Sequence, residues 1–148
     1  LLKMRRMGRN AMMEWILLGV LFYDSIEDIY RRRIRVMPNV LAGLTGILLH
    51  FMKAPGSIGG LVPGIFIGVL VLFTAIVSKE AIGKGDGLMV IMTGCWLGGV
   101  KNLLLLLGAC FFAGIFSGIQ LILKKAERRT EIPFAPFILI ACAGVVML

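Results

Sequence analysis

The sequence predicts an all-α, polytopic membrane protein with about six transmembrane helices in one bundle. Hydrophobic residues make up 59% of the 148 residues, and the mean hydropathy is +0.95, which is far from the composition of soluble domains. The apolar residues form long runs, separated by short basic or Gly/Pro-rich clusters. A soluble domain of this length could not bury so much apolar surface, so lipid must be the solvent for much of it.

Six apolar segments are candidates for membrane helices, each of which needs about 20 residues to cross a bilayer. A cluster of arginines ends the first segment. Pro38 and Asn39 open the second, because proline suits the first turn of a helix. Gly60, Gly64 and Gly68 recur at four-residue spacing in the third, which permits close packing against another helix. The predicted segments cover residues 12–29, 38–52, 58–78, 88–100, 103–123 and 133–148.

The distribution of Lys and Arg predicts the orientation in the membrane. The loops after the first, third and fifth segments carry ten basic residues, against six elsewhere in the chain. Positive residues accumulate on the cytoplasmic side, so these loops are expected to face the cytoplasm from the inner (cytoplasmic) membrane, although the basic N-terminal cluster argues the other way. The ten residues are Arg31, Arg32, Arg33, Arg35, Lys79, Lys84, Lys124, Lys125, Arg128 and Arg129.

The net charge of +8 does not indicate a nucleic-acid partner. The positive charges lie in short clusters between apolar runs, a pattern typical of loops held at an anionic membrane surface. The cysteines, Cys95, Cys110 and Cys142, each lie in an apolar run without a CxxC pair, and His50 is the single histidine. These residues favour neither a zinc site, a disulfide framework nor a histidine-based triad, and we expect no metal or cofactor.

Three aspartates are the candidates for chemistry, because carboxylates in or beside membrane helices are costly and a functional role is the first hypothesis. Asp24 and Asp28 are four residues apart at the end of the first segment and share a helix face. Asp86 lies in a predicted Gly-rich loop, residues 79–87, at the same level of the membrane. Two apposed carboxyl groups share a proton. The ionised group can then take a proton from water while the protonated group donates to a scissile carbonyl.

Structural roles for the same residues remain open at this point. Gly83 and Gly85 permit positive φ angles and close backbone approach, so a substrate strand could lie against the loop, yet glycine and aspartate are also ordinary turn residues. Asp28 could instead pair with an arginine of the following cluster. For Asp24, structural pairing and a functional role are equally supported, and Glu27 is expected to be solvated or charge-paired.

Three motifs follow one another along the chain. They are Asp28 with a basic stretch to Ile34 and then Pro38-Asn39, the sequence Gly83-Lys84-Gly85-Asp86, and the sequence Ile132-Pro133-Phe134-Ala135-Pro136-Phe137. Together they resemble the prepilin leader peptidases, the Gly-x-Gly-Asp aspartyl proteases of type IV pilus and related secretion systems. The resemblance runs from the first segment to the last.

The resemblance implies roles for particular residues. Asp28 and Asp86 would be the catalytic pair, with Asp24 in reserve. The motif or substrate-contact residues would be Gly83, Lys84, Gly85, Pro38 and Asn39. The sequence departs from the family where Arg35-Val36-Met37 separates Ile34 from a proline that usually follows directly. It departs again after Asp86, where Gly87-Leu88 replaces a frequent hydrophobic residue and lysine.

The same resemblance implies an aspartic endopeptidase that removes the leader of a pilin-like precursor on the cytoplasmic side. We expect one membrane-embedded peptidase domain over residues 1–148, without the N-terminal methyltransferase region and paired cysteines of larger members. The chain thus resembles the short, peptidase-only branch associated with Flp-type (tight-adherence) pilins. The implied partners are a prepilin-like membrane protein and the lipid bilayer, and the sequence does not predict an oligomeric state.

Two alternatives stay open. Tyr23-Asp24 with the Gly83–Asp86 motif faintly resembles the presenilin or signal-peptide-peptidase group, although the Pro-Ala-Leu element of that group is missing. The aspartates could also serve proton or ion handling in a non-catalytic membrane component.

Overall fold

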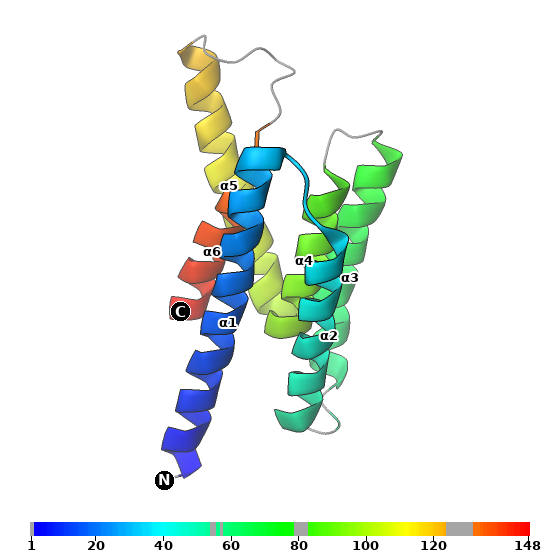
Figure 1. The fold of residues 1–148 in the computed structure, drawn as a ribbon, viewed down its shortest axis with the longest axis vertical. Helices are drawn as coiled ribbons and strands as arrows, with labels where there is room; N and C mark the ends of the chain where they lie inside the picture. Colours follow the sequence, from blue (N-terminus) through cyan, green and yellow to red (C-terminus); the bar gives the residue numbers. More distant parts are fainter. Residues whose placement is uncertain (1, 54–55, 57, 79–82, 124–131) are drawn as a thin grey trace.

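The computed structural model describes residues 2–53, 56, 58–78, 83–123 and 132–148, and within these ranges it contains six α-helices and no strand (Figure 1). The prediction of an all-α fold is confirmed. The helices are α1 (Leu2–Arg31), α2 (Val36–Lys53), α3 (Ile58–Val77), α4 (Lys84–Leu97), α5 (Gly99–Ile122) and α6 (Ala135–Met147).

The boundary between α4 and α5 differs from the sequence prediction. A turn was expected at residues 101–102, but Gly98 alone separates the two helices, with a φ angle of 75°. Residues other than glycine rarely adopt this angle, so Gly98 is the position at which the chain can reverse. Lys101 and Asn102 lie instead in the first turn of α5.

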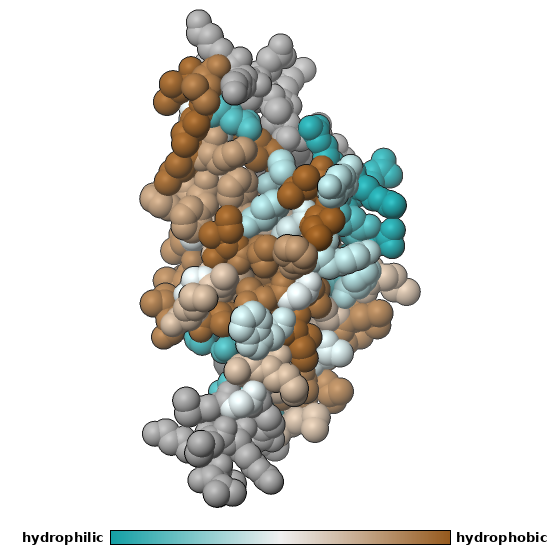
Figure 2. Space-filling model, turned by 60° about the vertical axis from the view of Figure 1, so that its left-hand side comes forward, coloured by the Kyte–Doolittle hydropathy of each residue, from teal (hydrophilic) through white to brown (hydrophobic). Residues whose placement is uncertain are grey.

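The surface of the bundle is that of a membrane protein. Among the described helices, α2, α3 and α5 are each long and apolar enough to cross a bilayer. Large apolar side chains are exposed on these helices, including Leu48 (60%), Phe73 (64%) and Phe111 (65%). Figure 2 shows hydrophobic residues spread over much of one face, with hydrophilic residues gathered toward one edge. The α4 and α6 helices, with 14 and 13 residues, reach only about 20 Å at 1.5 Å per residue.

The helices form two groups that meet in the middle of the bundle. Helices α2, α3 and α4 pack together on one side, and α1, α5 and α6 pack together on the other (Figure 1). The two groups are joined chiefly by contacts of α5 with α3 and α4, whereas α1 and α2 touch little. The ends of α1, α3 and α5 lie at the same end of the molecule as the starts of α2, α4 and α6 (Figure 1).

Glycines allow α3 and α4 to approach until their backbones touch. A Cβ atom on Gly68 would lie 2.5 Å from the Cα of Ile91, and one on Gly87 would lie 2.6 Å from the Cα of Leu72. The close helix packing predicted from the glycine spacing is therefore confirmed for Gly64 and Gly68, which pack against α4, but not for Gly60, where an added Cβ would have no atom within 4 Å. This contact positions α4, the helix that carries Asp86.

Two polar side chains, buried Asn102 and half-buried Trp96, connect α4 with its neighbours. The Asn102 side chain accepts a hydrogen bond from the Thr93 hydroxyl (2.7 Å) and donates to the carbonyls of Gly64 and Val90 (3.0 Å each). The indole nitrogen of Trp96 donates to the carbonyl of Ala42 on α2 (2.8 Å). The C-terminal half of α4 is thus bonded to α2, and through Asn102 to α3 and α5.

Candidate active site

Asp24 and Asp28 both lie in the interior, near the C-terminal end of α1. Their exposed fractions are 0% and 8%. Four-residue spacing places the two on one helix face, as the sequence predicts. This face of α1 turns toward the inside of the bundle rather than toward solvent or lipid.

Asp28 contacts the start of α6. Its Oδ2 atom accepts a hydrogen bond of 3.1 Å from the backbone N–H of Ala135, the first residue of that helix. The first N–H groups of a helix have no partner within it and carry a partial positive charge, so a carboxylate is favoured there. The third sequence motif, around Pro133 and Phe134, is therefore the element that meets Asp28.

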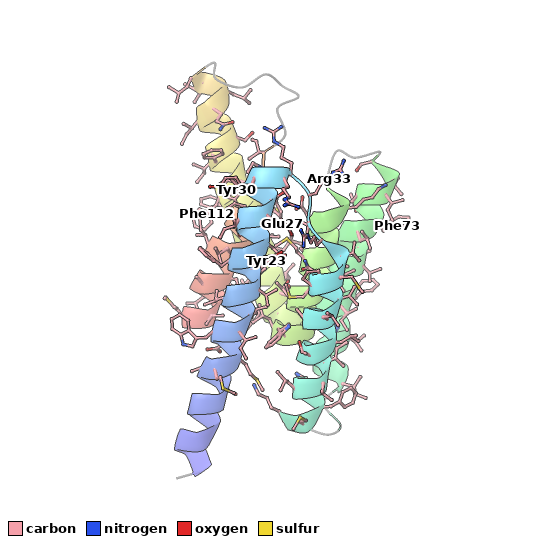
Figure 3. The ribbon with its side chains drawn as sticks, viewed as in Figure 1. Tyr23, Glu27, Tyr30, Arg33, Phe73 and Phe112 are labelled. Carbon is pink, nitrogen blue, oxygen red and sulfur yellow. The ribbon has the colours of Figure 1, made fainter. Side chains whose placement is uncertain are left out.

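The arginine cluster does not pair with Asp28 or Asp24 in the described part of the chain. The ion pair found there joins Glu27 Oε1 to Arg35 Nε at 2.7 Å. Glu27 is thus charge-paired, one of the two expected states, although it is 8% exposed and not solvated. In Figure 3 Glu27 lies on the side of α1 that faces α2 and α4.

Asp86 belongs to the first turn of α4, which corrects the prediction of a Gly-rich loop up to residue 87. Gly83 is the residue before the helix, and its φ angle of −62° is not in the positive region that we expected. Its lack of a side chain serves a different purpose, because a Cβ atom there would lie 2.9 Å from Oδ2 of Asp86. The Asp86 carboxyl group folds back over Gly83, as an acidic third residue does in a capping box.

Gly85 is needed for a contact within the chain. A Cβ atom at this position would lie 2.8 Å from the Cβ of Ile34, which belongs to the segment between α1 and α2. The space beside Gly85, where we expected that a substrate strand could lie, is thus occupied by Ile34. Lys84 is exposed beside it.

Pro38 and Asn39 lie in the first turns of α2, which starts at Val36. Residues 35–37, which separate Ile34 from Pro38, thus contain the start of the helix. Asn39 is 1% exposed, and its Nδ2 atom donates to the Arg35 carbonyl at 3.1 Å.

The folded chain brings acidic groups from α1 and α4 together at one end of the bundle. The carboxyl group of Asp86 lies within the electrostatic influence of Asp28, and Asp24 is under the influence of both Glu27 and Asp28. Two carboxyl groups near each other, one buried on α1 and one half-buried on α4, can share a proton and polarise a water molecule between them. Among the described residues, no group of three or more His, Cys, Asp or Glu side chains is arranged to hold a metal ion.

Sequence reasoning missed the burial of Glu27 and did not identify Arg35 as its partner. The signal was present as the spacing of acidic residues at positions 24, 27 and 28, which places all three on adjacent parts of one face. It was not used because glutamate beside arginines is usually a solvated group.

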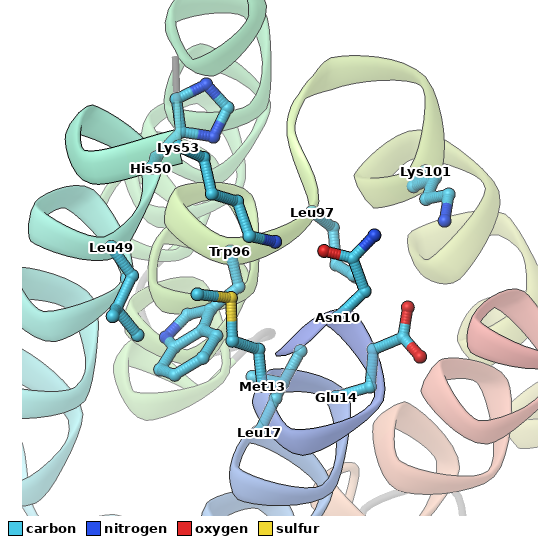
Figure 4. A pocket seen from close by; sticks show the side chains of 11 residues that line it. Asn10, Met13, Glu14, Leu17, Leu49, His50, Lys53, Trp96, Leu97 and Lys101 are labelled. Carbon is cyan, nitrogen blue, oxygen red and sulfur yellow. The ribbon is translucent and has the colours of Figure 1, made fainter. Parts of the chain in front are cut away.

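A second polar region lies at the opposite end of the same side of α1. A cavity of about 190 Å³ opens there between α1, α2 and the α4–α5 junction (Figure 4). Its charged and polar lining includes Asn10, Glu14, His50, Lys53 and Lys101. None of the predicted catalytic or motif residues lines it.

Comparison with known proteins agrees with the motifs. Residues 15–118 match the type IV leader peptidase family, a range that includes both Asp28 and Asp86. The chain is 30% identical over 138 residues to a protein of Aeromonas hydrophila named prepilin leader peptidase/N-methyltransferase, covering 88% of this chain and 46% of the relative. A protein of the same name from Pseudomonas aeruginosa is 30% identical over 139 residues, covering 90% of this chain and 47% of the relative.

The chain spans about half the length of the curated relatives that it matches. No solved structure matches it. Of the three functional hypotheses, the family match favours the prepilin type over the presenilin type. Because the match covers most of the sequence and both aspartates, the chain belongs to the type IV leader peptidase family.

Proposed function

We propose that this protein is an aspartic endopeptidase that cleaves the leader peptide of prepilin-like precursors, with Asp28 and Asp86 as its catalytic pair. The observation that supports the proposal is that these two carboxyl groups, on α1 and α4, lie close enough to interact electrostatically at one end of a membrane bundle. Three helices converge there, because the start of α6 donates a hydrogen bond to Asp28.

The chemistry requires one water molecule and one shared proton. The ionised carboxylate removes a proton from water while the water oxygen attacks the carbonyl carbon of the scissile peptide bond. The protonated carboxyl group donates its proton to the carbonyl oxygen. Collapse of the tetrahedral intermediate then breaks the C–N bond, and the leaving amine takes a proton from the carboxyl group that gained one from water. The intermediate returns one hydroxyl proton to the other carboxyl group, which restores the shared proton.

The site end of the bundle carries the exposed residues Arg31, Arg32, Arg33 and Lys84. Basic residues accumulate on the cytoplasmic side of membrane proteins, so we place the catalytic end at the cytoplasmic face of the inner membrane. A precursor with a hydrophobic helix would be held in the bilayer with its leader at this level. The relatives are named for two activities, and of these we propose only the peptidase for this chain. The Flp-type pilins are the proposed substrate class, as the sequence resemblance implies.

The test is co-expression of the protein with candidate pilin precursors from the same genome. We expect a shortened pilin with the intact protein and a full-length precursor with Asp28→Ala and with Asp86→Ala. Cleavage that persists in both variants would exclude this catalytic pair.

Asp24→Ala decides between the prepilin and the presenilin types of site. Loss of cleavage with Asp24→Ala and normal cleavage with Asp28→Ala would transfer the first catalytic role to Asp24. Glu14→Gln is the matched control, because Glu14 is a carboxylate on the same helix that lines the opposite cavity. We expect it to cleave normally.

A further inference from the structure

Buried acceptor atoms without donors surround Asp24. Neither carboxyl oxygen of Asp24 has a hydrogen-bond partner among the described residues, and the same is true of Asn39 Oδ1 and Glu27 Oε2. Asp24 is 0% exposed and Asn39 is 1% exposed. An unsatisfied buried acceptor is costly, and a buried unpaired charge is more so.

The Asn39 side chain lies close enough to the Asp24 carboxyl group, across the α1–α2 boundary, to interact with it. Asn39 Nδ2 already donates to the Arg35 carbonyl. The charged groups around Asp24 are the carboxylates of Glu27 and Asp28, and the nearby guanidinium of Arg35 is paired with Glu27. A single proton on Asp24 removes the repulsion and supplies a donor for Asn39 Oδ1.

We propose that Asp24 is a protonated positioning residue whose O–H donates to the Asn39 side chain and so holds the start of α2 against the end of α1. With the Glu27–Arg35 ion pair, this bond forms a clasp, defined here as Asp24, Glu27, Arg35 and Asn39. The clasp brackets the short segment that contains Ile34. Ile34 packs on Gly85, and Asp86 directly follows Gly85 in the chain. The clasp therefore determines the position of the first turn of α4 relative to Asp28.

This inference rests on the proposed peptidase activity, because a positioning role is defined relative to the catalytic pair. It gives Asp24 a role that differs from its reserve role as a catalytic acid. A catalytic carboxyl must exchange its proton, whereas a positioning donor needs only to keep a hydrogen on the atom that faces Asn39. The substitution Asp24→Asn separates the two roles: it retains the shape and a donor, but it cannot exchange a proton as an acid.

The experiment measures kcat and KM for cleavage of a precursor that the wild-type full-length protein cuts, in detergent or in membranes. We expect Asp24→Asn to retain kcat within about threefold of the wild type. We expect Asp24→Leu and Asn39→Leu each to lower kcat about tenfold or more with little change in KM, because small displacements of catalytic groups have large effects. The double variant should lose no more than either single variant, since residues that act as a pair are not additive.

The control is Ser25→Ala, which removes a buried polar group next to Asp24 whose hydroxyl donates within its own helix to the Leu21 carbonyl. It should cleave normally. Three results would overturn the inference: inactivity of Asp24→Asn comparable to that of Asp28→Asn, full activity of Asp24→Leu, or losses that multiply in the double variant.

If a leucine variant does not accumulate in the membrane, Asp24→Asn still decides, because it preserves the side-chain shape. A wild-type protein that cuts no candidate precursor would instead argue against the proposed function itself, so the two failures are distinguishable.

Discussion

The two polar regions of the protein differ in which of their charged groups are buried. At the site end, Asp24, Glu27 and Asp28 are less than 10% exposed and Asp86 is half-buried, whereas the basic residues at this end are exposed. In the cavity at the other end, Glu14 shares the lining with Lys53, Lys101 and His50. Both regions lie beside α1 in a bundle that is otherwise mostly apolar.

The difference supports the proposed position of the catalytic site. Mixed charges around an open cavity can offset one another and remain hydrated, so they need no special role. Like charges in an interior repel one another and must share protons or capture donors, which is the condition that makes carboxyl groups effective acids and bases near neutral pH. The site end is also the place where α1, α4 and α6 converge, whereas the cavity has no comparable arrangement of acceptors.

The sharpest test of this comparison is a matched set of amide substitutions. We expect Asp28→Asn and Asp86→Asn each to lower kcat about a thousandfold or more, because either change removes one member of a proton-sharing pair. The double variant should be little worse than either single variant, since groups that act as a unit are not additive. Initial rates of precursor cleavage measure this. A loss of similar size in Glu14→Gln would abolish the distinction between the two ends.

The second test places a side chain between the segment that contains Ile34 and the first turn of α4. Gly85→Val should lower cleavage about a hundredfold, because its Cβ would collide with Ile34 and displace the following aspartate. Ile34→Ala in the same protein should restore part of the activity by vacating that space. A double variant as inactive as Gly85→Val alone would show that Ile34 is not the cause.

Helix number and the ends of most helices followed from apolar runs and turn residues, because these depend on local composition. The sequence also places Asp24 and Asp28 on one face. It could not show which of them would meet Asp86, since that depends on how α4 and α6 pack against α1. The hydrogen bond from Ala135 to Asp28, over 107 positions of sequence, is such a tertiary contact.

The start of α4 was mispredicted for a related reason. Three of the five residues 83–87 are glycines, and their local conformational preference favours a loop. In the folded protein two of them are helical, because each meets another segment at a distance that a side chain would not permit. Tertiary packing thus outweighs the cost of glycine in a helix, which is about 1 kcal/mol per residue.

The third test separates packing from site chemistry. Gly68→Ala should lower the free energy of unfolding by about 1–3 kcal/mol, because the added methyl group would overlap the Ile91 backbone. Gly114→Ala, with no atom within 4 Å of the added Cβ, should raise stability slightly through helix propensity. Thermal unfolding in detergent measures both. Equal effects at the two positions would contradict the assigned contact between α3 and α4.

The smallest effect is expected from the cavity itself. Lys101→Gln changes a charge on the lining without adding bulk and leaves the site end untouched, so cleavage should remain within about twofold of the wild type. The distance from the catalytic end also limits electrostatic influence, since hydrated charges are screened over about 10 Å at 0.1 M ionic strength. If the kcat of this variant fell tenfold, the cavity would be coupled to the carboxylate cluster through the bundle, and the two ends would have to be treated as one functional unit.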